Sequence, residues 1–257
     1  MFDRVSDKMR VRSAALLLTI DNRLDQILKY WLLLAGLISA ARIAFTPHPA
    51  GSAGLSTFAS YMLLVVAPFA STLLALRWFS KGHLQAQPTM RLAHFGQWRQ
   101  VSRHEAEGHD LYGTTGIMVS LLVGMMLNVP VRAAEYLAAM PPLPEIAPRW
   151  LSVLHVAMTF DVVLFSGLYM IAFVAALRRV PLFPRLLVAI WVGDLAMQLV
   201  TAKLVTQAGD LPPAVATALH HVLEGNVKKV LISMALWLPY LLLSTRVNVT
   251  YRHRLPA

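Results

Sequence analysis

The chain of 257 residues contains no cysteine. That absence excludes disulfides, thiolate catalysis, iron–sulfur clusters and zinc sites with thiolate ligands. Charge is also scarce, because Asp, Glu, Lys and Arg make up 14% of the chain, whereas a soluble domain carries roughly 25%. The sequence has no Gly-rich phosphate loop and no Ser–His–Asp pattern of a hydrolase. None of these enzyme classes is therefore favoured.

The few charges are separated by long apolar stretches. No charge occurs between Asp110 and Arg132, and Asp161 is the only one between Arg149 and Arg178. A helix needs about 20 apolar residues to cross the hydrocarbon of a membrane. In lipid the backbone must also satisfy its own hydrogen bonds, which a helix does. We therefore predict an all-α fold, a polytopic bundle of six transmembrane helices.

The six predicted spans cover about residues 30–45, 57–76, 113–131, 150–177, 186–202 and 230–245. Between the last two, residues 211–213 read Leu-Pro-Pro and are followed by an apolar segment at 214–223. This pattern predicts a turn and then a short separate helix at the outer surface. Ahead of the first span, apolar residues recur at helical spacing, which predicts an amphipathic helix lying in the membrane interface. Its apolar face consists of Val5, Met9, Leu16, Ile20, Leu24 and Ile27.

The distribution of Lys and Arg predicts the orientation. Seventeen of the 23 lie near the two termini, in the loop after the second span or in the turn after the fourth, and six lie in the other connections. Because basic loops stay in the cytoplasm, both termini are predicted to be cytoplasmic. The same rule accounts for the net charge of +10, which in a soluble protein would suggest nucleic acid. We predict no nucleic acid as a partner.

Two motifs in the second half of the chain point to a family. The turn after the fourth span is Arg178-Arg179-Val180-Pro181-Leu182-Phe183-Pro184, and the last span ends Leu236-Trp237-Leu238-Pro239-Tyr240, then Ser244-Thr245-Arg246-Val247 and Thr250-Tyr251. With these motifs residues 112–251 resemble the YdgK-type family of bacterial inner-membrane proteins of unknown function. The resemblance implies a four-span unit and an inner-membrane location, and it implies no activity. We accordingly divide the chain into residues 1–108, with the first two spans, and residues 109–257.

Asp161 and Asp194 lie near the middle of the fourth and fifth spans. An ionisable side chain at that depth is costly unless it is paired or hydrated. Gln198 lies one helical turn from Asp194 on the same face, and a short turn joins the two spans, so the carboxylates can face each other. One interpretation is a proton or cation relay, with one carboxyl group protonated because like charges repel. The other is a pair of hydrogen-bonded groups that holds the helices together.

Other polar residues support weaker hypotheses. Pro239 is expected to bend the last span, and Tyr240, Arg246 and Tyr251 beside it are either a simple helix anchor or a cytoplasmic contact for lipid or a partner. Arg132 and Glu135 are expected to pair at the outer end of the third span.

His104 and His109 in the long loop are weak candidates for a metal site, because they are five residues apart, whereas two ligands on one helical face are four apart. His155 is expected to be a hydrogen-bonded residue near the outer interface. No cofactor is predicted.

Three functions remain open. The absence of a catalytic group of residues favours an accessory or scaffold subunit of a larger membrane assembly, with the lipid bilayer and other membrane subunits, or a second copy, as partners. A small proton- or cation-coupled transporter that uses Asp161 and Asp194 is the alternative. A membrane enzyme acting on lipid or quinone is the third.

Overall fold

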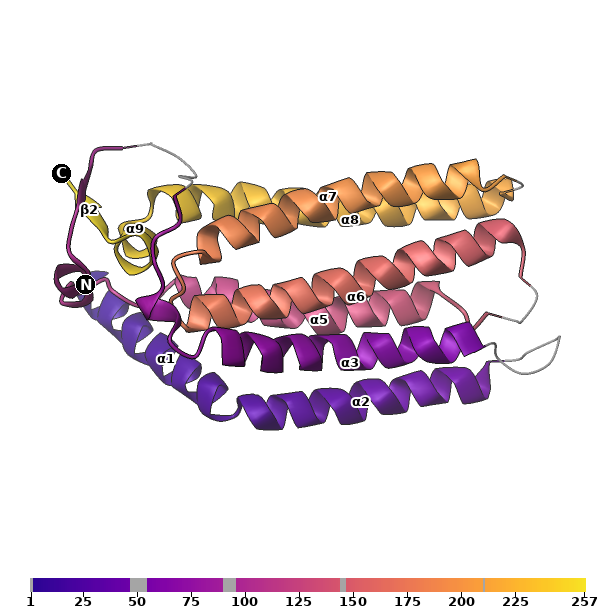
Figure 1. Ribbon diagram of the computed structural model, residues 1–257, viewed down its shortest axis with the longest axis horizontal. Coiled ribbons are helices and arrows are strands. Elements are labelled where there is room, and N and C mark those ends of the chain that lie inside the picture. The colour runs from indigo at the N-terminus through magenta and orange to yellow at the C-terminus, as the bar shows by residue number, and fades with distance from the viewer. Residues whose placement is uncertain (1, 47–54, 90–95, 144–146, 210) are drawn as a thin grey trace.

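The computed structural model describes residues 2–46, 55–89, 96–143, 147–209 and 211–257, with only the backbone for residues 2–10 and 55–56. Six of the described helices are long and apolar enough to cross a membrane, judged by length and composition. They lie side by side along the long axis of the molecule, and both termini lie at one end of it (Figure 1). The prediction of an all-α bundle with six spans is confirmed.

The spans are α2 (Leu24–Phe45), α3 (Leu55–Trp78), α5 (Met118–Ala139), α6 (Arg149–Leu177), α7 (Phe183–Gln207) and α8 (Pro213–Leu243). The shorter elements are α1 (Phe2–Asn22), η1 (Gly82–Leu84), β1 (Trp98–Gln100), α4 (Arg103–Glu107), α9 (Thr245–Arg252) and β2 (Arg254–Pro256).

The third span differs from its prediction, because α5 begins and ends later in the chain. Gly113 and Gly116 have φ of 107° and 72°, a conformation that cannot continue a right-handed helix. The helix therefore starts after these glycines and continues to Ala139. As a consequence, Arg132 and Glu135 lie within the span and not at its end.

The last span also differs from its prediction. The separate surface helix expected at residues 214–223 is wrong, because α8 runs without interruption from Pro213 to Leu243. Pro213 occupies the first turn of the helix, where proline is tolerated because that N–H has no partner inside the helix. Asn226 and Lys229 are thereby placed on a span, one helical turn or less from each other.

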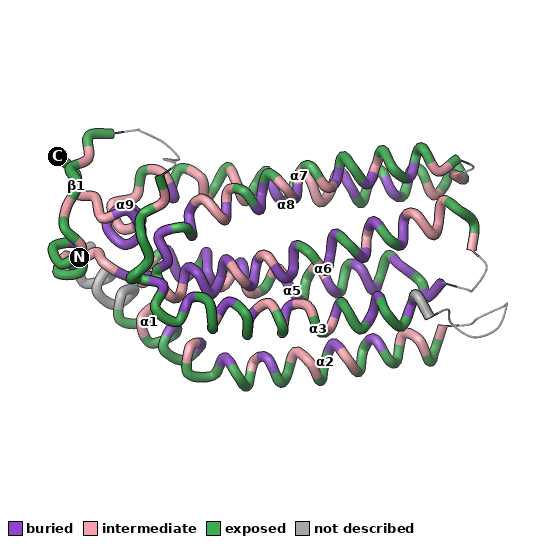
Figure 2. The backbone as a smooth tube through the Cα atoms, viewed as in Figure 1, coloured by how far each residue is buried: buried purple, intermediate pink, exposed green. Residues whose placement is uncertain are grey.

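α6 is the central helix of the bundle and has the largest buried share of the six spans. It packs against α3, α5 and α7, while α2 packs on α3, and α8 on α7. Figure 2 shows this arrangement as a concentration of buried residues along α6. α3 comes close to α6 at Gly167, where a Cβ atom would lie 2.7 Å from Ser71 Oγ.

An amino-terminal helix is present, and it lies at an angle to the spans at the end that carries the termini (Figure 1). Its position in a membrane interface stays a prediction. α1 ends at Asn22, so Leu24 and Ile27 of the predicted apolar face belong to α2. Ile20 of α1 is buried, together with Leu17, whereas Leu16 is exposed. The side chains of Val5 and Met9 lie outside the described residues. α1 thus packs part of its apolar face against the bundle.

The carboxyl-terminal tail is joined to the long loop by a two-stranded antiparallel sheet, which the sequence did not predict. β1 pairs with β2 so that Trp98 lies opposite Pro256 and Gln100 opposite Arg254. Nearby, the backbone N–H of Gly113 donates to Thr250 Oγ1 (2.9 Å). These contacts fasten the segment before α5 to the end of the chain. The division between residues 108 and 109 stays a prediction.

Candidate functional site

The centre of the site is Arg132, which α5 carries into the middle of the bundle. Its Nε donates to Asn128 Oδ1 (3.1 Å) one turn earlier on the same helix, so the plane of the guanidinium is held in a fixed orientation. The rings of Phe165 and Tyr169 on α6 lie with their centres 5.3 Å and 5.8 Å from its central carbon. Aromatic faces attract a cation at this distance. Arg132 is therefore positioned by two helices.

The guanidinium bridges the two predicted carboxylates. Its Nη1 donates to Asp161 Oδ2 on α6 (2.9 Å), and its Nη2 donates to Asp194 Oδ2 on α7. The Asp194 side chain is fully buried and the Asp161 side chain is 9% exposed. The prediction that these residues lie close together is confirmed, but a cation lies between them. Arg132 offsets part of the repulsion between the two carboxylates, and the protonation of one of them stays a prediction.

Gln198 extends this network, as its position one turn from Asp194 predicts. Its Nε2 donates to Asp161 Oδ1 (3.1 Å) and to Asp194 Oδ1 (3.3 Å). Its Oε1 accepts from Asn226 Nδ2 on α8 (3.3 Å). Four helices, α5 to α8, thus contribute polar groups to one hydrogen-bonded cluster, which we name the charged network: Arg132, Asp161, Asp194, Gln198 and Asn226.

The predicted pairing of Arg132 with Glu135 is wrong. On an α-helix, residues three apart are rotated by about 60° from each other, and here the two side chains go to different helices. Arg132 faces α6 and α7, whereas Glu135 forms an ion pair with Lys229 on α8. Both side chains of this second pair are about half exposed.

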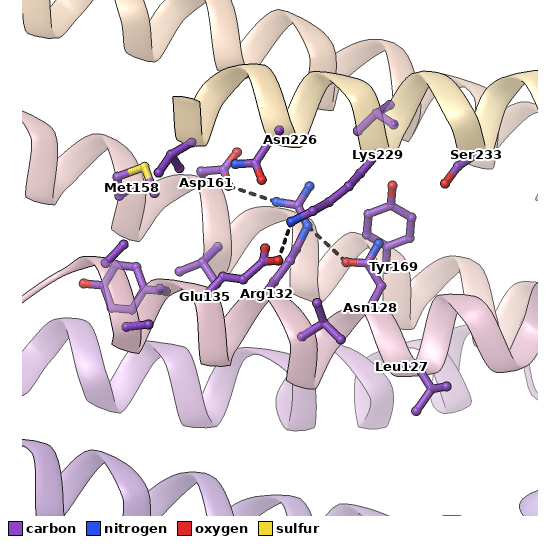
Figure 3. A pocket seen from close by; sticks show the side chains of 18 of the residues that line it. Leu127, Asn128, Arg132, Glu135, Met158, Asp161, Tyr169, Asn226, Lys229 and Ser233 are labelled. Atoms are coloured by element: carbon purple, nitrogen blue, oxygen red, sulfur yellow. Dashed lines mark hydrogen bonds and ion pairs between the residues drawn. The ribbon is translucent and has the colours of Figure 1, made fainter. Parts of the chain in front are cut away.

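A pocket of about 690 Å³ lies between α5, α6 and α8, beside the charged network. Figure 3 shows Arg132 and Asp161 next to it, with Lys229 reaching across to Glu135. The α5 and α8 lining extends from Gly124 and Ser233 to Ala139 and His221, on both sides of Arg132 and Lys229 along these helices.

On the side of the network that faces the termini, the core is apolar and closed. Four side chains there are completely buried and belong to one continuous hydrophobic cluster: Leu122, Phe173, Leu187 and Leu241. The pocket borders the charged network along α5, α6 and α8.

A second group of buried polar side chains lies between α5 and α6. The hydroxyl of Tyr136 is 2.7 Å from Thr159 Oγ1 and 3.3 Å from His155 Nε2. His155 is thus a hydrogen-bonded residue, as expected. Thr159 is close to Asp161 in sequence, but the two are rotated by about 200° on the helix, so Thr159 faces Tyr136.

The residues expected at the cytoplasmic surface occupy different environments. Tyr251 is 1% exposed, and its hydroxyl donates to the backbone oxygen of Ala176 (2.9 Å). Its burial raises the pKa of its hydroxyl well above the usual value. Arg246 Nη1 donates to Thr115 Oγ1 (2.8 Å) and to the Leu111 oxygen (3.2 Å), so it holds the segment before α5. Tyr240 is half-buried on α8.

His104 and His109 do not converge on a common point in the described structure. His104 is exposed, and Nδ1 of His109 accepts from the backbone N–H of Leu111 (3.1 Å). The nearby carboxylates of Glu105 and Glu107 pair with arginines. No group of three or more His, Cys, Asp or Glu side chains that could hold a metal is found among the described residues.

Sequence reasoning missed Arg132 as a site residue, although a signal was present. Asn128 and Arg132 are four residues apart, the spacing at which two side chains meet on one helical face. The signal was lost because the span was expected to end at residue 131.

Comparison with models of protein families, with curated proteins and with solved structures finds no match to this chain.

Proposed function

We propose that this membrane protein is a small proton- or cation-coupled transporter, in which Asp161 and Asp194 hold the coupling proton or cation. The observation that supports the proposal is a buried charged network that borders a pocket. An ion pair that only holds helices together does not need to be reached by solvent or ligand. The free-energy cost of burying such a pair is smallest when it is fully hydrogen-bonded and sealed from water. Asp161 and Arg132 instead line a pocket of about 690 Å³.

The balance of charge in the network favours a positive ligand. One guanidinium faces two carboxylates, so the three groups carry a net charge of −1 when both carboxylates are ionised. An uncompensated charge at membrane depth is costly. A proton on either carboxyl group, or a monovalent cation beside it, neutralises the network. Binding of that positive charge is the coupling step.

The same charges link two parts of the bundle that have to separate in a transport cycle. α7 packs along α8 and α5 along α6, while α6 and α7 also pack against each other. The Arg132–Asp194 and Lys229–Glu135 ion pairs connect the two helix pairs, as does the hydrogen bond from Gln198 to Asp161. Protonation of Asp194 weakens its bond to Arg132 and allows α7 and α8 to move relative to α5 and α6. Alternating access in other transporters arises from such movements of helix bundles.

The test is proton or cation flux in vesicles that contain the purified chain. A pH gradient, or a Na⁺ or K⁺ gradient, is applied across the vesicle membrane, and a trapped pH-sensitive or cation-sensitive dye reports the flux. Asp161→Asn and Asp194→Asn keep the size of each side chain and remove its charge. We expect each variant to lower the flux by about tenfold or more, because removal of a required charge abolishes one state of the cycle.

The matched control is Asp21→Asn, which removes a carboxylate from the Asp21–Arg178 ion pair outside the pocket. This variant is expected to retain the flux of the original chain. Circular dichroism and gel filtration identify variants that are folded. The proposal is rejected if folded Asp161→Asn and Asp194→Asn variants transport at the original rate, or if the original chain transports neither protons nor the cations offered.

We also propose a bacterial inner-membrane location with both termini in the cytoplasm. The distribution of Lys and Arg supports this orientation, and the resemblance to the YdgK-type family supports the location. An accessory or scaffold role within a larger assembly stays a prediction, and a stoichiometric partner that co-purifies in mild detergent would support it.

A further inference from the structure

Arg252, the last residue of α9, is buried and only partly hydrogen-bonded. It is 5% exposed. Its Nη1 donates to Asn248 Oδ1 (2.9 Å) and to the backbone oxygen of Leu242 (3.4 Å). Its Nη2 is fully covered and has no hydrogen-bond partner among the described residues. Buried donors in proteins are nearly always paired, so an unpaired one calls for an explanation, of which binding of an ion or ligand is one.

Two further arginines approach Arg252 from other elements. The rings of Phe183 and Tyr251 lie with their centres 5.0 Å apart, which sets the first turn of α7 against the last turn of α9. Arg185 follows Phe183 by two residues, and Arg254 follows Arg252 by two residues at the start of β2. The three arginines therefore lie in the same region of the fold, where Arg185 Nη1 also donates to the backbone oxygen of Pro181 (3.3 Å), and we name them the arginine cluster: Arg185, Arg252 and Arg254.

The positive charges near Arg252 act on its pKa in the same direction as its burial. Burial lowers the pKa of Arg252 to about 10, and the positive charges of Arg185 and Arg254 contribute to that decrease. No carboxylate acts on its pKa in the same way. Asn248 and the carboxyl-terminal end of α9 stabilise one side of the guanidinium, but they leave Nη2 unused.

The position of the arginine cluster matches the surface of a membrane. It lies where α7 begins and just after α8 ends, at the end of the bundle that carries the termini (Figure 1). Basic groups between transmembrane helices at this depth bind phosphate-bearing headgroups. Arginine suits such a ligand because its planar fork matches two phosphate oxygens at once.

We propose that Arg185, Arg252 and Arg254 form a binding site for a phosphate group at the membrane surface. The phosphate oxygens accept hydrogen bonds from Nη2 of Arg252 and from the two flanking arginines, and their negative charge offsets the repulsion among the three cations. Arg185 and Arg254 are half-buried, so their side chains form the path from solvent and turn to admit the ligand. The phosphate belongs either to the headgroup of an anionic phospholipid or to a soluble phosphate.

Binding is measured on the full chain purified in a neutral detergent. In one arm, native mass spectrometry compares the retention of phosphatidylglycerol with that of phosphatidylcholine. In the other arm, thermal unfolding is followed with inorganic phosphate, against sodium chloride at equal ionic strength. We expect the chain to prefer phosphatidylglycerol, or to be stabilised by phosphate beyond the effect of chloride. The first result identifies a lipid headgroup as the source, and the second a soluble phosphate.

The variants test whether the arginine cluster is the site. Arg185→Gln combined with Arg254→Gln changes only half-buried residues, and it is expected to weaken binding by about tenfold or more, a loss typical of charge-assisted bonds. Arg252→Lys keeps the charge but removes the fork, and it serves as a second variant if the double variant fails to fold. The control is Arg99→Gln, which removes an exposed charge on the neighbouring strand β1, where Arg99 pairs with Glu105.

Two results overturn the proposal. One is an original chain that does not distinguish phosphatidylglycerol from phosphatidylcholine and is stabilised no more by phosphate than by chloride. The other is a loss of binding in Arg99→Gln as large as that in the double variant, since diffuse surface charge then accounts for the binding.

Discussion

Replacement of Arg132 by Met is the most direct test of the charged network. Methionine preserves much of the length of the side chain and removes its charge and its donors. Asp194 and Asp161, whose side chains are 0% and 9% exposed, then lack their cation. Gln198 still donates to one oxygen of each carboxylate, but a neutral amide cannot offset two negative charges.

Breaking a buried ion pair by removing one partner costs about 3–5 kcal/mol. Arg132 serves two carboxylates, but each carboxyl group can take up a proton and so limit the loss. We therefore expect Arg132→Met to lower the free energy of unfolding by about 3–5 kcal/mol, and not by twice that amount. The triple variant with Asp161→Asn and Asp194→Asn leaves no buried charge, and it is expected to return to within about 1 kcal/mol of the original chain.

The assay is reversible unfolding in mixed micelles, followed by tryptophan fluorescence. Lys229→Met is the control, because its ion pair with Glu135 is half exposed and such pairs are worth about 0–1 kcal/mol. The reasoning is refuted if Arg132→Met costs no more than Lys229→Met. It is also refuted if the triple variant is as unstable as Arg132→Met alone.

Two further predictions concern the end of the bundle that carries the termini. A Cβ atom on Gly82 would lie 2.5 Å from Val180 Cγ2 and 3.0 Å from the backbone oxygen of Arg178. Gly82→Ala should therefore lower the free energy of unfolding, measured by thermal unfolding, by about 1–3 kcal/mol. The control is Gly36→Ala, where a Cβ atom has nothing within 4 Å, and an equal effect of both variants would contradict the close contact. Burial lowers the pKa of His253 below its ordinary value of 6.5; the unfolded chain therefore binds more protons just below pH 6.5, and stability falls as pH decreases through that value. After correction for the intrinsic pH dependence of amide exchange, the protection of the β1 and β2 amides should fall on acidification. In His253→Asn, where asparagine tolerates the left-handed backbone at φ of 50°, the part of this fall that is attributable to His253 should disappear.

Much of the charged network was predictable from the sequence. Asp161, Asp194 and Gln198 lie at mid-span positions, and the periodicity of the helix places Asp194 and Gln198 on one face. The short connection between α6 and α7 makes them antiparallel neighbours, so the two carboxylates meet at a similar depth. These are local relations, and spacing along the chain specifies them.

The position of Arg132 was not predictable in the same way. Hydropathy shows that an apolar segment crosses the membrane, but the glycines at 113 and 116 decide where α5 begins. The partner of Arg132 depends further on which face of α5 meets α6 and α7. Glu135 is the nearer acidic residue in sequence, yet Lys229 on α8 pairs with it.

The sequence by itself determined that the chain forms six apolar helices, because hydrocarbon requires about 20 apolar residues in a hydrogen-bonded helix for each crossing. It also determined that two carboxylates lie at the depth of the membrane. Only the tertiary structure decided that one arginine bridges these carboxylates and that a pocket reaches them. The reason is physical, because the free energy of a buried charge depends on the atoms around it. Here those atoms come from helices separated by up to about a hundred residues in the chain, as is usual for tertiary contacts.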